Sequence, residues 1–182
     1  MHEKIFTTHH RSDLINPIDD LISNIKKPLE EGGVIIFLNG QLGSGKTAFV
    51  QELAYSVGVE SRVQSPTFVL MKKYSIDSAV IPELYTLIHI DAYRLEPHHK
   101  EALNVEDFLS ESGTLVLIEW PTSIDLGQEL AFANIDFEIM PNFKKNKSND
   151  NEQYDQDGEY ANYDEIEDDN DEARKIKIRY KK

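Results

Sequence analysis

Several features common in proteins are missing from this sequence. Its 182 residues contain no cysteine, which excludes disulfide bonds and any metal site built on thiolates. The N-terminal segment MHEKIFTTHHRSDLINP has no long apolar run and carries acidic side chains. We therefore expect neither a signal peptide nor a membrane span, and we expect a cytoplasmic protein. The length is that of one domain with a substantial hydrophobic core.

Positive charge is also scarce, and negative charge is concentrated in one segment. The formal net charge is −14, but residues 148–172 hold twelve acidic residues and no Lys or Arg. The rest of the chain has 21 acidic and 19 basic residues, so it lacks the basic surface of a strong nonspecific nucleic-acid binder. Residues 146–173 offer too few apolar side chains to offset the entropy of ordering. We expect a single domain over residues 1–182 with a disordered acidic insertion at 146–173.

Helical periodicity appears in three parts of the chain. Residues 16–29 carry an apolar stripe, with Asn16 as the expected N-cap and Pro28 expected to end or disturb the last turn. Residues 46–58 place apolar side chains on one helical face and end in a glycine. A further helix is expected around residues 103–109.

Apolar runs predict the strands. They lie at residues 34–39, 67–74, 84–91, 114–120, 132–140 and 175–180. Continuous apolar runs fit strands buried on both faces, as in a parallel sheet. The last two runs alternate between apolar and polar residues and are expected to pair as an antiparallel hairpin across the acidic segment. The fold class predicted is α/β, with a mostly parallel central sheet flanked by helices and a C-terminal antiparallel hairpin.

The segment GQLGSGKT, residues 40–47, matches the pattern G-x-x-x-x-G-K-[ST]. It lies between a predicted strand and a predicted helix, which is the context that a phosphate-binding loop requires. Its glycines allow backbone N–H groups to turn toward phosphate oxygens, and the positive end of the following helix adds to the attraction. Lys46 can reach the β- and γ-phosphates, and Thr47 offers its hydroxyl to Mg²⁺. The predicted nucleotide-binding residues are Gly40, Leu42, Gly43, Ser44, Gly45, Lys46, Thr47 and Ala48.

This loop makes the predicted fold P-loop NTPase-like, and such a site needs a carboxylate for the metal and a group that orients water. Asp91 and Glu119 each end a predicted buried strand, where ligands collect in open α/β sheets. We predict Glu119 as the metal contact together with Thr47, and Asp91 as the residue nearer the water; the alternative is that both acids face solvent. Thr67 in the SPT segment either senses the γ-phosphate or forms a plain turn. His89 is expected to be a packed, hydrogen-bonded histidine rather than a ligand.

Four segments, GQLGSGKT, SPTF, HIDAYRL and IEWP, occur in this order at separations similar to those of the TsaE family. These proteins are P-loop ATPases of bacterial tRNA threonylcarbamoyladenosine biosynthesis, and the resemblance covers about residues 15–140 and the final strand. It implies ATP and Mg²⁺ as cofactors, the proteins TsaD and TsaB as partners, and tRNA as the substrate of their complex. It also implies an ATPase that is weak alone and stimulated by its partners, whose nucleotide cycle supports turnover of the assembly.

The resemblance also assigns roles to individual residues. The matching positions are Lys46, Thr47, Thr67, Asp91, Glu119 and Trp120. Gln41 stands where the family commonly has Asp. If that Asp makes a metal or partner contact, the contact does not transfer to this chain, whereas phosphate binding by the loop backbone does not depend on this side chain. Asn104 stands where Gly is frequent, and the acidic insertion is outside the family's compact pattern.

Other functions are compatible with a phosphate-binding loop. A small-molecule kinase is one, although such enzymes usually carry an arginine-rich lid and this chain has few arginines without a cluster. A GTPase is another, but the guanine-selective pattern N-K-x-D has no better match than NKSN at residue 146, which lacks the Asp. A third is a nucleotide-gated binding module whose own hydrolysis is negligible.

Overall fold

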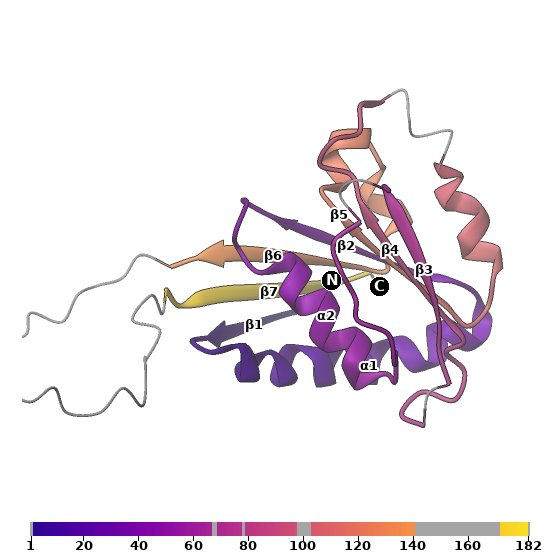
Figure 1. The fold of residues 1–182 in the computed structure, drawn as a ribbon, viewed down its shortest axis with the longest axis horizontal. Coiled ribbons are helices and arrows are strands. Elements are labelled where there is room, and N and C mark those ends of the chain that lie inside the picture. Colours follow the sequence, from indigo (N-terminus) through magenta and orange to yellow (C-terminus); the bar gives the residue numbers. More distant parts are fainter. Residues whose placement is uncertain (1, 67–68, 78, 98–102, 141–171, 182) are drawn as a thin grey trace, which may run out of the picture.

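A mixed seven-stranded sheet forms the centre of the computed structural model, which describes residues 2–66, 69–77, 79–97, 103–140 and 172–181 (Figure 1). The strands are β1 (His2–Thr8), β2 (Val34–Gly40), β3 (Met71–Ser75), β4 (Thr86–Asp91), β5 (Thr114–Glu119), β6 (Ala133–Ile139) and β7 (Arg174–Tyr180). Their order across the sheet is β1-β7-β6-β2-β5-β4-β3. Strands β6, β2, β5 and β4 run parallel, and the outer strands join antiparallel. The predicted α/β class with a parallel centre is confirmed.

The predicted antiparallel pairing of the last two strands is also confirmed. β6 and β7 pair along their whole length, from Ala133 opposite Tyr180 to Ile139 opposite Arg174. The sequence did not predict β1, which pairs antiparallel with β7 at the edge of the sheet. Most β1 side chains are exposed, so the strand has no buried face that would give it an apolar alternation.

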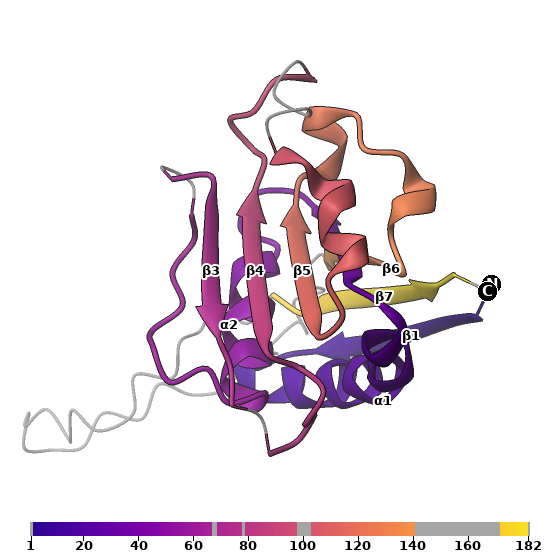
Figure 2. The same cartoon turned by 90° about the vertical axis from the view of Figure 1, so that its right-hand side faces the viewer.

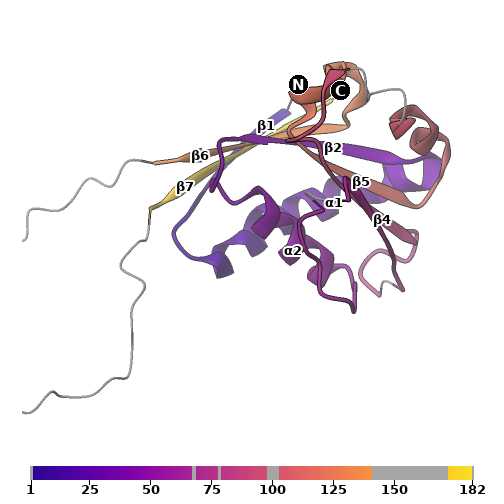
Figure 3. The ribbon, with the colours of Figure 1, turned by 45° about the horizontal axis from the view of Figure 1, so that its top comes forward.

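The α-helices α1 (Ile15–Glu31) and α2 (Lys46–Ser56) cover one face of the sheet (Figure 3). The described segments on the opposite face include three 3₁₀ turns, and Figure 2 shows this face toward the viewer, with helical turns close to β5. These turns are Val105–Ser110, Pro121–Ile124 and Gln128–Leu130. The expectation of flanking helices therefore holds for one face; on the other, the described residues include these turns and the helical Leu103.

Two local expectations about α1 are wrong in detail. Asn16 does not cap α1, because a 3₁₀ turn at Arg11–Leu14 runs directly into the helix, and Asn16 Nδ2 instead donates to the Asp13 carbonyl at 3.3 Å. Of the two outcomes expected for Pro28, an end of the helix is wrong, because α1 continues to Glu31. Burial of the neighbouring Leu29 side chain, which is fully enclosed in the core, favours that extra turn over an exit at the proline.

Two further boundaries differ from the prediction. Within the expected helix at 103–109, Leu103 is α-helical and a 3₁₀ turn begins after Asn104, whose φ of 43° lies in the left-handed region that Asn and Gly tolerate best. The expected strand at 67–74 is extended only from Met71 in its described part, because Leu70 also has a positive φ, 66°.

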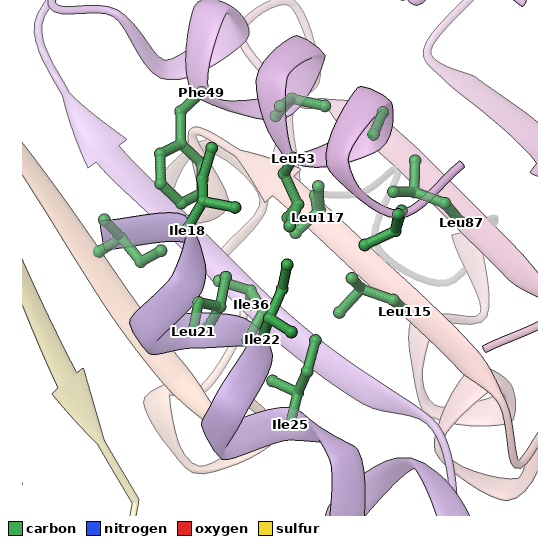
Figure 4. Packing of buried hydrophobic residues seen from close by; sticks show 14 of the residues in the cluster. Ile18, Leu21, Ile22, Ile25, Ile36, Phe49, Leu53, Leu87, Leu115 and Leu117 are labelled. Atoms are coloured by element: carbon green, nitrogen blue, oxygen red, sulfur yellow. The ribbon is translucent and has the colours of Figure 1, made fainter. Parts of the chain in front are cut away.

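The side chains of the central strands alternate between two cores. On the helical face, Ile36, Leu115 and Leu117 pack against the apolar stripe of α1 and against Phe49 and Leu53 of α2 (Figure 4). On the other face, Ile35, Phe37, Val116 and Ile118 form a second cluster with the 3₁₀ segments. Burial on both faces explains the continuous apolar runs, because neither set of alternate residues meets water.

Neither the length nor the hydropathy of any helix in the described ranges would suit a membrane crossing. The expectation for the acidic insertion falls mainly on residues 146–171, which lie outside the described part of the chain. The two ends of this segment are described: the N–H of Met140 donates to the Ala173 carbonyl at 2.8 Å. The described residues that flank this segment therefore lie side by side at the ends of β6 and β7.

Candidate functional site

The carboxyl ends of three parallel strands meet at one edge of the sheet. Leu38 of β2 lies opposite Glu119 of β5, and Asp91 of β4 lies opposite Glu119 on its other side. The strand ends are also joined beyond the ladder, since the N–H of Trp120 donates to the Leu38 carbonyl at 3.2 Å and the N–H of Ala92 to the Glu119 carbonyl at 3.0 Å. This register brings both predicted acids next to the loop that follows β2.

The Gly-rich loop, residues 40–47, turns directly from β2 into α2. Gly45 precedes the first turn of α2 with a φ of 103°, and Gly40 has a φ of 146°. A Cβ atom on Gly40 would lie 2.5 Å from the Phe137 carbonyl oxygen and 2.7 Å from Ser44 Oγ. Glycine is thus required at this position both by the backbone angles and by the close approach of β6.

Lys46 is folded back onto its own loop. Its ammonium donates to the carbonyls of Gly40 and Gln41 at 2.8 and 2.9 Å, and it lies 4.0 Å from the centroid of the Trp120 ring. The residue is only 4% exposed. Burial lowers the pKa of Lys46, and the Glu119 and Asp91 carboxylates act in the opposite direction by favouring the charged form.

Glu119 is the centre of a buried polar chain. Thr47 Oγ1 donates to its two carboxylate oxygens at 2.9 and 3.1 Å, and His89 Nε2 lies 2.9 Å from Oε1. Glu119 is 3% exposed and His89 is fully buried. The expectation that His89 is packed and hydrogen-bonded is confirmed, although the sequence gave no indication that its partner would be Glu119.

Asp91 is held by a different set of donors. Its Oδ2 accepts from Ser65 Oγ at 3.0 Å and its Oδ1 from the N–H of Tyr93 at 3.1 Å. The residue is 5% exposed, so the alternative in which both strand-end acids simply face solvent is wrong. Thr67, predicted beside them, lies outside the described residues, whereas Ser65 of the same segment reaches the site.

A cleft of about 420 Å³ opens between the Gly-rich loop and the two acids. It is lined by Leu42, Gly43, Gly45, Lys46, Thr47, Ala48, Ser65, Asp91, Tyr93, Arg94, Glu119 and Trp120. Most of the predicted binding residues therefore share one cleft with both predicted acids. Gly40 and Ser44 do not line it.

A second cavity, of about 290 Å³, lies on the other side of the same loop. It is lined by Thr8, His9, His10, Arg11, Leu14, Gly43, Ser44, Gly45, Ala48, Phe137, Arg174 and Ile176. Ser44 Oγ is buried here without a hydrogen-bond partner among the described residues. The sequence did not predict this cavity, because its walls come from β1 and the turn after it, the Gly-rich loop, α2, β6 and β7. These segments are far apart in the chain and meet only in the folded sheet.

No group of three or more His, Asp or Glu side chains gathers closely enough to hold a metal ion by itself within the ranges that the structure describes. A metal in the cleft would therefore take much of its coordination from a ligand or from water. Mg²⁺ commonly binds in this way, with one or two protein oxygens and several others from phosphate and solvent.

These features define an α/β protein in which a Gly-rich strand–loop–helix turn faces two buried carboxylates across a cleft. A family model described as "Threonylcarbamoyl adenosine biosynthesis protein TsaE" matches residues 14–149, and the chain belongs to this family. The resemblance seen in the four sequence segments is thereby confirmed. The family acts in tRNA threonylcarbamoyladenosine biosynthesis.

Curated relatives carry the same name. The chain is 33% identical to the tRNA threonylcarbamoyladenosine biosynthesis protein TsaE of Haemophilus influenzae over 50% of its own length, and 32% identical to that of Bacillus subtilis over 61%. These matches span 53% and 66% of the two relatives. Among solved structures, the crystal structure of Bacillus subtilis YdiB superposes with a TM-score of 0.57 at 20% identity, covering 97% of this chain and 84% of that one. This likeness supports the fold.

Proposed function

We propose that this protein is a Mg²⁺-dependent ATPase with a P-loop NTPase-like fold, acting in the tRNA N6-threonylcarbamoyladenosine modification complex. The observation that carries the proposal is the hydrogen bond from Thr47 to Glu119 at the mouth of the Gly-rich loop. It joins the hydroxyl that such loops offer to Mg²⁺ with a carboxylate from the neighbouring strand, as a nucleotide–metal site requires.

The loop fits a phosphate in its shape and its charge. Gly40 and Gly45 have the backbone angles that let N–H groups converge, and the loop leads into the N-terminus of α2. The Lys46 ammonium rests on two loop carbonyls. A phosphate oxygen is a stronger acceptor for a charged donor, so we propose that Lys46 exchanges these carbonyls for the β- and γ-phosphates of ATP.

Thr47 and Glu119 are the residues that would hold Mg²⁺, with Glu119 acting directly or through water. When bound, Mg²⁺ neutralises charge on the phosphate oxygens. Asp91 lines the same cleft, and the Ser65 hydroxyl and the Tyr93 N–H fix its orientation. We propose that Asp91 orients the attacking water and that Thr67, two residues after Ser65, senses the γ-phosphate.

The second cavity would receive the nucleoside. The second cavity and the cleft share Gly43, Gly45 and Ala48 as lining residues. A nucleotide that extends across the loop would therefore have its phosphates in the cleft and its base in the second cavity. Polar contacts are available from the buried Ser44 Oγ, which has no hydrogen-bond partner in the described part of the chain, and from the side chains of His9, His10, Arg11 and Arg174. Residues of β1 and β7 would thus contribute to binding.

The partners proposed are TsaD and TsaB, with tRNA as the substrate of the complex and the cytoplasm as its location. The nearly neutral body of the chain supports a role in which tRNA is held mainly by the partners. The proposed ATPase is weak alone and stimulated in the assembly.

The test compares ATP hydrolysis by this protein alone and with a purified TsaB–TsaD pair, with Mg²⁺ or with a chelator. We expect low activity alone, a large increase with the pair, and loss of both with the chelator. No stimulation by the partners would refute the assigned role. Transfer of phosphate to an added small-molecule acceptor instead of water would support a kinase.

A further inference from the structure

We infer that His89 is a positioning residue for Glu119, whose imidazole N–H holds the carboxylate in the orientation that serves Thr47 and Mg²⁺. The inference rests on the proposed function and adds a residue to its site. His89 Nε2 lies 2.9 Å from Glu119 Oε1, and both side chains are almost completely enclosed. Because His89 lies opposite Leu117 in the parallel pair of β4 and β5, it is one diagonal step from Glu119 on the same sheet face.

The carboxylate determines which ring nitrogen carries the hydrogen. An ionised carboxylate only accepts hydrogen bonds, so Nε2 must donate to it. Nδ1 is buried and has no hydrogen-bond partner among the described residues. A neutral imidazole has one N–H and one acceptor nitrogen, and this geometry assigns the N–H to Nε2.

The contact restrains Glu119 from a second direction. Thr47 reaches the carboxylate from α2 at 2.9 and 3.1 Å, whereas His89 reaches Oε1 from β4. Two donors on different elements leave the carboxylate little freedom to rotate. Partners that orient metal-binding side chains in this way typically contribute about 10- to 100-fold to metal affinity. The loss of the Nε2–H donor should therefore weaken nucleotide binding only when Mg²⁺ is present.

The experiment compares His89→Leu, His89→Gln and His89→Asn by calorimetric titration with ADP, in Mg²⁺ and in a chelator. The Gln amide nitrogen is as many bonds from Cβ as Nε2 is, whereas the Asn amide nitrogen corresponds to Nδ1. We expect His89→Leu and His89→Asn to lose about 10- to 100-fold of the Mg²⁺-dependent affinity, with Mg²⁺-free affinity unchanged, and His89→Gln to recover most of the loss. Leu87→Val, on the same face of β4, is the matched control: it should lower Tm and retain the Mg²⁺ dependence.

A double-mutant cycle and a spectrum complete the test. If His89 acts through Glu119, adding His89→Leu to Glu119→Gln should produce little further loss. In the unsubstituted protein, nitrogen-15 NMR of the imidazole should show the Nε2–H tautomer, a readout that does not depend on any variant folding. Full Mg²⁺ dependence in His89→Leu, equal behaviour of the Gln and Asn variants, or an Nδ1–H tautomer would overturn the inference. Absence of Mg²⁺-dependent ADP binding in the unsubstituted protein would instead refute the proposed function.

Discussion

Thr47 and Glu119 are 72 residues apart in the chain, yet the Thr47 hydroxyl donates to both carboxylate oxygens of Glu119 at 2.9 and 3.1 Å. Thr47 is the second residue of α2, and Glu119 is the last residue of β5. Their contact follows from the pairing of β2 with β5, which places the Gly-rich loop beside the end of its neighbour. Substitutions at and around this junction test what it binds and what each group does.

Lys46→Ala should weaken nucleotide binding while the fold survives. The ammonium is the charged donor proposed to meet the β- and γ-phosphates, and charge-assisted hydrogen bonds of this kind support a loss of about 10- to 100-fold. Because burial already lowers the pKa of Lys46 by disfavouring its charged form, its removal should cause little loss of stability. Calorimetric titration with ATP measures the affinity, with the exposed Lys26→Ala as control. Equal affinities for Lys46→Ala and the control would remove the phosphate-binding interpretation.

Thr47→Ala and Thr47→Ser should separate the hydroxyl from the rest of the side chain. The Ala variant loses the oxygen that binds Mg²⁺ and contacts Glu119, so nucleotide affinity should no longer depend on Mg²⁺. The Ser variant keeps that oxygen and should retain most of the dependence. Titrations with and without Mg²⁺ provide the measurement. If Thr47→Ala still responds fully to Mg²⁺, its hydroxyl is only a partner of Glu119.

Asp91→Asn and Glu119→Gln should both depress hydrolysis, for different reasons. Each keeps the shape of the side chain and removes its charge. Asp91→Asn should lower the rate by about 100-fold or more while Mg²⁺-dependent binding remains, because a group that orients or activates water contributes on this scale. Glu119→Gln should lower both the rate and the Mg²⁺ dependence. Partner-stimulated ATPase and titration data together distinguish the two, and full activity in both variants would contradict their assignment.

Replacement of residues 147–172 by a short Gly–Asn turn should leave Tm nearly unchanged. The ends of β6 and β7 are already adjacent, with Ile139 opposite Arg174 and the Met140 N–H bonded to the Ala173 carbonyl. A shorter connection changes closure entropy only slightly, because that entropy depends logarithmically on length.

The same variant tests whether the acidic segment has an electrostatic role. A passive segment predicts full partner-stimulated ATPase after the replacement. Loss of partner binding that depends steeply on salt would instead identify an arm that contacts a basic surface, since exposed charges are screened by salt.

The local pattern of the chain was sufficient to predict α2, the central strands and the hairpin of β6 with β7. Each of these elements has a buried face, so the spacing of its apolar residues indicates whether it is a helix or a strand. The Gly-rich loop could be found for a similar reason, because the backbone angles at Gly40 and Gly45 restrict which residues can occupy those positions. The register of parallel strands then made it reasonable to expect Asp91 and Glu119 at the same edge.

Only the tertiary structure decided the rest. β1 has too few buried side chains to show an alternating apolar pattern. Its position in the sheet depends on pairing with β7, at the other end of the sequence. The same pairing builds the second cavity, whose walls have no common local signal. The sequence predicted a packed, hydrogen-bonded His89, but the choice of Glu119 as its partner required the diagonal geometry between β4 and β5. The burial of a side chain is reflected in the apolar pattern of its own segment and can be predicted from the sequence. Contacts between distant segments form only when the sheet brings those segments together.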